Sequence, residues 1–193
     1  METKIYSVFP ACGKTWLCKH QEQYGLKILD SDSSQFSWII KEVEDNEYVI
    51  IDGGEMKPLT HKEKVRNPEF PANYIKHIKE QIGKYDYIFV SSHASVRAAL
   101  EAEGIDFTIV YPAEHCFSEW VGRCFIRDKR GETGCNPGVL YDNWSQWISE
   151  CEGVGRHHTE IVLMNNQHLS VWLIGRTLRA EVRVGFIQAT LRN

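Results

Sequence analysis

One short stretch near the start of the chain constrains the fold more than any other. An apolar run over residues 5–9 stops at Pro10, passes through two small residues and enters a helical pattern led by Gly13, Lys14 and Thr15. When small residues turn a strand into a helix, backbone N–H groups and the helix N-terminus can face one anion. The stretch therefore predicts an α/β fold with an anion-binding turn after its first strand.

The residue types in this turn are those of a phosphate-binding loop. Lys14 would reach the β- and γ-phosphates of a nucleoside triphosphate, and the Thr15 hydroxyl would bind magnesium. Val8 stands where the full motif has its first glycine, and Pro10 removes one N–H group from the loop. The alternative is an ordinary strand-to-helix turn with an exposed lysine. The expected nucleotide-binding residues are Ala11, Cys12, Gly13, Lys14, Thr15 and Trp16.

Length and composition place the chain among ordinary globular proteins. It has 193 residues, which fits one domain, and 42% of them are hydrophobic and 25% charged. The formal net charge of -4 argues against a protein that binds duplex nucleic acid by neutralising phosphates. A short or single-stranded substrate stays open. The oligomeric state does not follow from the sequence.

Targeting signals and cysteines suggest where the protein works. No apolar run reaches the roughly 20 residues that cross a bilayer, and the polar start lacks a signal-peptide pattern. The six cysteines show no Cys-x-x-Cys pair, so we expect free thiols in a reducing cytoplasm. A zinc site is the alternative. It would draw on His115, Cys116, Cys124 and Cys135.

Acidic residues follow the second predicted strand, at residues 26–29. Asp30 and Asp32 come directly after it, and open α/β sheets place their sites at the carboxyl ends of strands. Two carboxylates at this spacing can hold hydrated magnesium or activate an acceptor hydroxyl. We expect Asp32 to act in catalysis and metal binding and Asp30 to act in substrate binding. The alternative is an N-cap for the next helix.

The segment after the aspartates is aromatic and then charged. Phe36 and Trp38 are candidates for a wall on which an acceptor base stacks, or else they are core residues of a short helix. Residues 41–67 are interpreted as a flap over the acceptor site or an inserted hairpin. Residues 72–82 have apolar side chains at helical spacing.

The clearest buried strand covers residues 85–93 and ends in serines and His93. Arg97 falls in the first turn of the next predicted helix, where a cation is unfavourable to the helix dipole. This position indicates a bound anion, so Arg97 is a candidate substrate-binding residue. Another buried strand is expected over residues 104–112.

Residues 114–138 contain a basic and aromatic stretch that we interpret as a lid. Arg123 and Arg127 are four residues apart and share a helix face. Arginines on a closing lid would stabilise charge on a transferred phosphoryl group and exclude water. The alternative is a solvated basic face. A final strand is expected at residues 160–164, and the arginine-rich tail at 175–193 has no assigned role.

Together these patterns predict a three-layer parallel sheet wrapped by helices. The segments that carry a family resemblance are the loop at 9–15, the acidic cluster at 29–34, the Asn67-to-Pro71 loop, the strands at 85–93 and 110–112 and the lid arginines. In these segments the chain resembles the P-loop kinases of small molecules. Among them it is similar to nucleoside-monophosphate-kinase-like proteins, including the small nucleotide kinases of phages and bacteria. The Asp-x-Asp is also similar to that of shikimate kinases.

The resemblance spans about residues 4–165 and implies a fold with a lid, together with ATP and Mg²⁺ as cofactors. It implies transfer of the γ-phosphoryl group to a nucleoside or deoxynucleoside monophosphate. Residue by residue, it makes Lys14, Asp32, Arg123 and Arg127 the catalytic candidates. Two alternatives stay open: a kinase of another hydroxyl-bearing metabolite or modified nucleotide, and a regulator that binds nucleotide without turnover.

Overall fold

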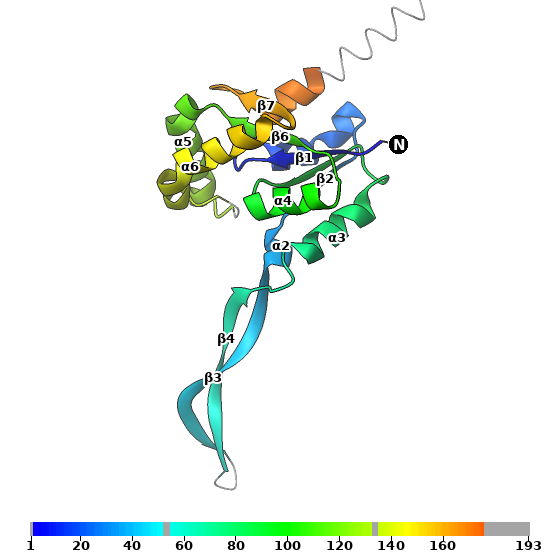
Figure 1. Ribbon diagram of the computed structural model, residues 1–193. Coiled ribbons are helices and arrows are strands. Elements are labelled where there is room, and N and C mark those ends of the chain that lie inside the picture. The colour runs from blue at the N-terminus through cyan, green and yellow to red at the C-terminus, as the bar shows by residue number, and fades with distance from the viewer. Residues whose placement is uncertain (1, 52–54, 133–134, 176–193) are drawn as a thin grey trace, which may run out of the picture.

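The computed structural model describes residues 2–51, 55–132 and 135–175, so the tail at 176–193 lies outside the described residues. A parallel sheet of five strands forms the body (Figure 1). Its order is β2-β5-β1-β6-β7, with bounds β1 Lys4–Val8, β2 Ile28–Asp30, β5 Tyr87–Ser91, β6 Thr108–Pro112 and β7 Thr159–Leu163. This arrangement confirms the predicted α/β class.

The central strands are nearly continuous apolar runs because both of their faces are covered. In β1 the last four residues are buried, and in β5 Ile88, Phe89 and Val90 are fully buried. Helices flank the sheet, with α3 packed on α4 and α5 packed on α6. Their bounds are α1 Lys14–Lys19, α2 Ser34–Ser37, α3 Ala72–Gln81, α4 Ala94–Ala102, α5 Phe117–Lys129 and α6 Pro137–Gly155, with short 3₁₀ turns η1 Gln21–Tyr24 and η2 Glu114–Cys116.

The strand order creates a point where connections diverge. From β1 the chain continues to β2 at one edge of the sheet, whereas from the neighbouring β6 it continues to β7 at the opposite edge. In open α/β sheets a crevice forms outside the carboxyl ends of two such strands, and ligands bind there. The loop that contains Gly13, Lys14 and Thr15 leaves β1 at this point.

The described residues of the predicted flap or hairpin, 41–51 and 55–66, lie in two long antiparallel strands, β3 Trp38–Ile51 and β4 Glu55–Arg66. The hairpin projects from the body near α2 and α3 as an arm (Figure 1). Its base is tied to the body by Asn67, which donates its backbone N–H to Ser37 O (3.1 Å) and its side-chain amide to Phe36 O (2.9 Å). We call residues 38–51 and 55–66 the arm.

Residues 114–138, the predicted lid, form η2, α5 and the start of α6, with residues 133 and 134 outside the description. Trp120 and Cys124 of α5 are fully buried in the core. The segment is therefore packed against the body in this structure, and its closing motion stays a prediction. Within the described residues, no helix has the length and apolar character needed to cross a membrane.

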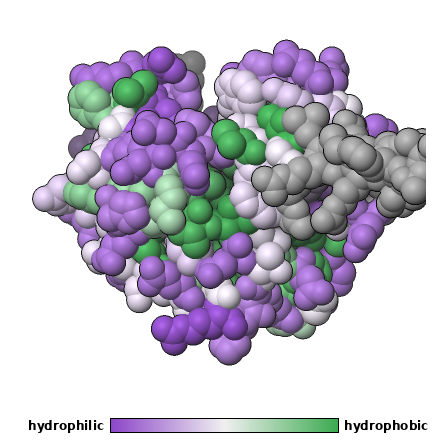
Figure 2. Space-filling model, turned by 90° about the horizontal axis from the view of Figure 1, so that it is seen from above, coloured by the Kyte–Doolittle hydropathy of each residue, from purple (hydrophilic) through white to green (hydrophobic). Residues whose placement is uncertain are grey.

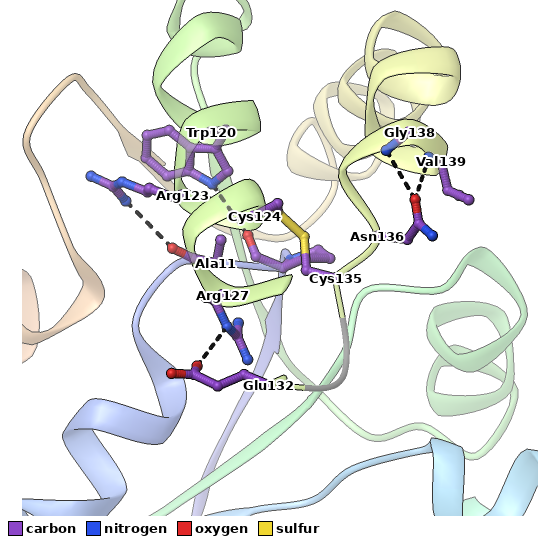
Figure 3. Close-up of a disulfide and its surroundings, with 11 residues drawn as sticks. Ala11, Trp120, Arg123, Cys124, Arg127, Glu132, Cys135, Asn136, Gly138 and Val139 are labelled. Carbon is purple, nitrogen blue, oxygen red and sulfur yellow. Dashed lines mark hydrogen bonds and ion pairs between the residues drawn. A yellow bond between two sulfur atoms is a disulfide. The ribbon is translucent and has the colours of Figure 1, made fainter. Parts of the chain in front are cut away.

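The expectation of free thiols is wrong for one pair of cysteines. Cys124 on α5 and Cys135 before α6 form a disulfide, with their Cα atoms 5.5 Å apart (Figure 3). The turn between α5 and α6 brings Cys135 back over α5, an arrangement that a spacing of 11 residues does not reveal. Cys12, Cys18, Cys116 and Cys151 are free thiols. No three metal-ligating side chains gather among the described residues, which leaves the zinc alternative without support.

Reducing this disulfide should destabilise the protein. Closing a loop of 11 residues removes entropy from the unfolded chain, so reduction should lower the free energy of unfolding by about 3 kcal/mol. Urea unfolding with and without a dithiol measures the difference. The Cys124→Ala/Cys135→Ala variant is the control and should show no response to the dithiol. Equal stability of oxidised and reduced wild-type protein would contradict the pairing.

Candidate functional site

The carboxyl edge of the sheet collects most of the polar residues that the sequence singled out. Across the edge, in strand order, Asp30 and Asp32 follow β2, His93 follows β5, and the loop at 9–13 follows β1. Residues 164–168 follow β7 at the far end. Parallel pairing places all of these segments on one side of the body.

The loop after β1 takes its shape from Ala11 and Gly13, and not from position 8, where the full motif has a glycine. Val8 is the last residue of β1 and is fully buried, and Phe9 N–H donates to Val110 O at 2.8 Å. Position 8 is thus ordinary strand and needs no glycine. The left-handed positions are Ala11, with φ 60°, and Gly13, with φ 96°.

Two left-handed residues separated by one residue curl the backbone into a concave turn. Among the described residues, the N–H groups of Ala11, Cys12 and Gly13 donate to no backbone carbonyl. Successive amides in such a curl form an anion-binding concavity. An alanine held at positive φ is also strained, and strain of this kind concentrates at functional sites.

Cys12 belongs to the loop but not to its chemistry. Its side chain is buried, and burial raises the pKa of the thiol to about 12. The nearby Lys14 and a hydrogen bond with Trp120 oppose this rise without cancelling it. The thiol is therefore protonated at neutral pH, and its backbone rather than its sulfur faces a ligand.

Lys14 and Thr15 lie where the loop enters α1. Lys14 Nζ donates to Val8 O at 3.4 Å, so the ammonium group folds back over the loop. The Thr15 hydroxyl donates to Asp30 Oδ2 at 3.1 Å. Asp32 Oδ1 instead accepts the N–H of Ser34 at 2.9 Å, at the start of α2. The structure thus brings Asp30, rather than Asp32, next to Thr15.

The Thr15 and Asp30 pair is a suitable donor set for magnesium. Mg²⁺ in nucleotide enzymes is held through one or two carboxylates, a hydroxyl and the substrate phosphates, and it keeps several waters. Two oxygen donors 3.1 Å apart beside the loop fit this requirement. The metal role predicted for Asp32 stays a prediction.

Helix α5 contacts the loop from the other side (Figure 3). Trp120 Nε1 donates to Pro10 O at 3.2 Å, and Arg123 Nη1 donates to Ala11 O at 3.4 Å. The Arg123 guanidinium lies 3.9 Å from the centre of the Trp120 ring and pairs with Glu119. Arg123, predicted as a lid arginine, is therefore beside the loop in this conformation.

Arg127 and Trp16 occupy more peripheral positions. Arg127 Nε pairs with Glu132 at 3.1 Å, inside the turn that the disulfide closes (Figure 3). Trp16 is 46% exposed and stacks on His20, with ring centres 4.2 Å apart. An exposed aromatic surface next to the loop is available for contact with a ligand.

The segment after β7 covers the loop and was not identified from the sequence. Leu169 N–H donates to Cys12 O at 3.0 Å, and Gln167 O accepts from Arg123 Nη2 at 2.9 Å. His168 packs so closely on Gly13 that a Cβ there would lie 3.4 Å from His168 Nδ1. These contacts join residues more than 40 positions apart, so no local pattern announces them.

Glu119 holds this covering segment in place. Burial pushes the pKa of its carboxyl upward, but the N–H of Asn166 and the Arg123 guanidinium outweigh burial and leave the pKa lowered. The carboxylate therefore stays ionised and anchors both α5 and the segment after β7.

A second cluster lies toward β2. Partial burial, followed by Arg66, Arg97 and Lys14, lowers the pKa of His93, and Asp32 opposes that shift. The positive charges of Arg66, Arg97 and Lys14 therefore act on His93, which is an exposed residue. Arg66 is the last residue of β4, and no local sequence pattern predicts that it lies near His93.

Phe36 and Trp38, which were predicted to stack on an acceptor base, lie in two different environments. Phe36 packs on α3, with ring centres 5.2 Å from Tyr74 and 4.8 Å from His77. Trp38 lies at the base of the arm, where the Arg66 guanidinium is 4.3 Å from its ring centre. Trp38 therefore lies next to one of the charges that act on His93, and the stacking role of both rings stays a prediction.

Arg97 is an interior residue that is 3% exposed. Its guanidinium donates to Ser92 O and lies 3.8 Å from Glu150. The Arg97 Nε has no hydrogen-bond partner among the described residues. Three buried side-chain oxygens also have no hydrogen-bond partner there. They are Ser31 Oγ after β2, Ser91 Oγ at the end of β5 and Asn73 Oδ1 in α3. Buried polar atoms are normally paired, so these groups retain capacity to bind a polar ligand or water.

The geometry defines a class: a parallel α/β protein whose switch point carries a loop with two left-handed residues, Ala11 and Gly13. Comparison with models of protein families finds no match. Comparisons with curated proteins and with solved structures also find none. The case for function therefore depends on the site itself.

Gly13→Ala tests whether the loop shape is needed for binding. Alanine at φ 96° is strained, and its Cβ would press on His168, so we expect stability to fall by about 1–2 kcal/mol and nucleotide affinity to drop at least tenfold. Gly25→Ala is the matched control, because its φ is 61° and no atom lies within 4 Å of the added Cβ. It should lose stability but keep affinity in calorimetric titration. Equal affinity of the two variants would argue against the loop.

The lowered pKa of His93 predicts a pH dependence of stability. The unfolded chain takes up this proton near pH 6.5, whereas the folded protein takes it up only at lower pH, so stability should fall as pH drops below about 6.5. His93→Gln should flatten this part of the profile, measured by urea unfolding from pH 7.5 to 5. His168, whose pKa is lowered by burial and by Arg123, contributes part of the remaining slope. An unchanged slope in the variant would refute this account of His93.

Proposed function

We propose that the protein is an ATP-dependent kinase that transfers a phosphoryl group to a nucleoside or deoxynucleoside monophosphate. The observation that supports this most is the order of groups along one sheet edge. The loop after β1 has Asp30, which bonds to Thr15, and His93, on which positive charges act, on the same side of it, toward β5 and β2. Donor phosphates, metal and an anionic acceptor each have a matching set of groups there.

The donor triphosphate would lie in the concavity formed by residues 11–13. Their free N–H groups would bind phosphate oxygens, and Lys14 would exchange Val8 O for the β- and γ-phosphates. Arg123 would stabilise charge on the transferred group after a small shift from Ala11 O. Magnesium held by Thr15 and Asp30 would neutralise phosphate charge when bound.

The acceptor monophosphate would lie on the β2 and β5 side of the loop. Arg66 and His93 are cationic or can become so, and Trp38 offers a ring next to Arg66 for a base. An acceptor phosphate oxygen is already an anion at neutral pH, so the reaction needs positioning more than a strong base. The bond from the γ-phosphorus to the bridging oxygen of ADP breaks as the bond to the acceptor oxygen forms.

A second candidate is a regulator that binds nucleotide without turnover. Its support is that Lys14 already bonds to the last carbonyl of β1, that Trp120 and Arg123 bond to loop carbonyls, and that residues 167–169 cover the loop. A loop held this way can bind a nucleotide as a structural ligand. A hydroxyl-bearing acceptor is the third outcome to be separated, with Asp32 then serving as base.

Lys14→Ala should remove activity without unfolding the protein. Lys14 is half-buried, and among the described residues its ammonium group bonds to the last carbonyl of β1, so the fold should persist while phosphoryl transfer falls by roughly 100-fold or more. Lys19→Ala, on the same helix but exposed and outside the loop, is the matched control and should keep wild-type activity. The assay uses labelled ATP with a panel of monophosphates, nucleosides and small alcohols.

Each outcome of that panel has a distinct meaning. Product on monophosphates alone supports the proposal, and product on an alcohol alone supports the hydroxyl-acceptor kinase. ATP binding that is lost in Lys14→Ala, without product on any acceptor, supports the regulator. Activity retained in Lys14→Ala would remove the basis of all three assignments.

A further inference from the structure

The disulfide fixes the end of α5 to the rest of the body. Cys124 is fully buried, whereas the residues that follow it in the helix are exposed, apart from the half-buried Arg127. Phe125 and Ile126 are each 52% exposed. The bond from Cys124 to Cys135 is therefore the covalent link that holds this end of the helix (Figure 3).

The exposed apolar side chains of α5 do not by themselves indicate a partner that would hold this end. Apolar residues scattered singly over a surface are normal in proteins. The face of the body opposite the arm also mixes the two kinds of residue, because hydrophilic residues cover most of it and hydrophobic residues occupy smaller areas (Figure 2). The disulfide is therefore expected to act within the molecule.

The start of α6, on the other side of the disulfide, has its own anchors. Asn136 Oδ1 accepts the N–H groups of Gly138 at 2.9 Å and Val139 at 3.1 Å, which caps the helix (Figure 3). Leu140 and Trp144 of α6 are buried in the core. Breaking the disulfide should therefore leave α6 in place and free the end of α5.

Arg123 connects this part of α5 to the loop after β1. It directly precedes Cys124, and its guanidinium donates to Ala11 O in the loop at 3.4 Å. The same guanidinium donates to Gln167 O in the segment after β7 at 2.9 Å. A shift of α5 at Cys124 would move Arg123 relative to both carbonyls.

A dithiol reductant can open the pair through Cys135, which is half-buried. Its thiolate attacks Cys135 Sγ, the bond between the two sulfurs breaks, and the electron pair leaves on Cys124 Sγ, which takes up a proton. The second thiol of the reductant then attacks the mixed disulfide and releases Cys135 as a thiol. The reductant ends as a disulfide, and two electrons and two protons have passed to the protein.

The four free cysteines are poor competitors for this exchange. Burial raises the pKa of Cys12 and Cys18 to about 12 and that of Cys151 to about 11, and it also raises the pKa of Cys116. These groups are protonated at neutral pH, whereas the thiolate is the form that attacks a disulfide. The pair can therefore open and re-form without exchange with the other cysteines of the chain.

We propose that the Cys124–Cys135 pair is a thiol–disulfide switch for nucleotide binding, in which the disulfide holds Arg123 beside the loop and reduction by a dithiol releases it. The ligand of this inference rests on the proposed function, but the movement of Arg123 requires no ligand. Reduction should weaken ATP binding about tenfold, which is an ordinary coupling between two sites. By linkage, saturating ATP should favour the disulfide over the dithiol by the same factor.

Calorimetric titration of ATP and Mg²⁺ into oxidised and dithiol-reduced protein measures this change in affinity, and circular dichroism checks that both forms are folded. The Cys124→Ala/Cys135→Ala variant should bind ATP as weakly as the reduced protein and should not respond to the dithiol. Cys151→Ala is the matched control, because it removes a buried thiol of α6 outside the pair and should keep the full response.

Hydrogen exchange without nucleotide separates the switch from the kinase proposal. The N–H of Asn166 bonds to Glu119 of α5 at 2.9 Å, and that of Leu169 bonds to Cys12 O at 3.0 Å. Reduction should speed exchange of both amides about fivefold or more relative to the amides of β5, which report any general loss of stability.

The outcomes distinguish the two proposals. If ATP binds, equal affinity of the oxidised and reduced forms overturns the switch and leaves the kinase proposal standing. If ATP does not bind, the kinase proposal fails and exchange decides: faster exchange after reduction supports the switch, and equal exchange overturns it. Unfolding on reduction would overturn it as well, because the disulfide would then serve the fold as a whole.

Discussion

The structure depends on the hydrogen bonding of β1 on both of its edges. β1 pairs in parallel with β5 through all five of its residues and with β6 through Tyr6, Ser7 and Val8. One more bond, from Phe9 N–H to Val110 O, extends the pairing with β6 to the first loop residue. A loop that starts from a strand fixed on both sides has little freedom, so the left-handed residues at 11 and 13 can hold a strained curl.

The sequence predicted the sheet well because its signals are local. The apolar runs at β1, β5 and β6 are short and bounded by turn residues, and parallel strands buried on both faces have this pattern. The loop position was predictable for the same reason, since Gly13 marks the strand-to-helix turn. Val8, which stands where the full motif has its first glycine, is the last residue of β1, and a glycine-like conformation falls at Ala11 instead.

The parts that could not be predicted are contacts between distant segments. Residues 167–169 cover the loop, Glu119 anchors that cover, and Arg66 reaches the His93 cluster from the end of the arm. The Cys124–Cys135 disulfide depends in the same way on how α5 and α6 pack. Aspartate spacing could not separate Asp30 from Asp32 either, because the choice depends on which carboxylate turns toward Thr15.

The arm and the site share one row of residues, Trp38 and Arg66. The ladder places this pair at the base of the arm, and the charge of Arg66 helps to lower the pKa of His93. Because Arg66 belongs to the arm and its charge also acts on His93, a change in the position of the arm's base would change the electrostatic environment of His93.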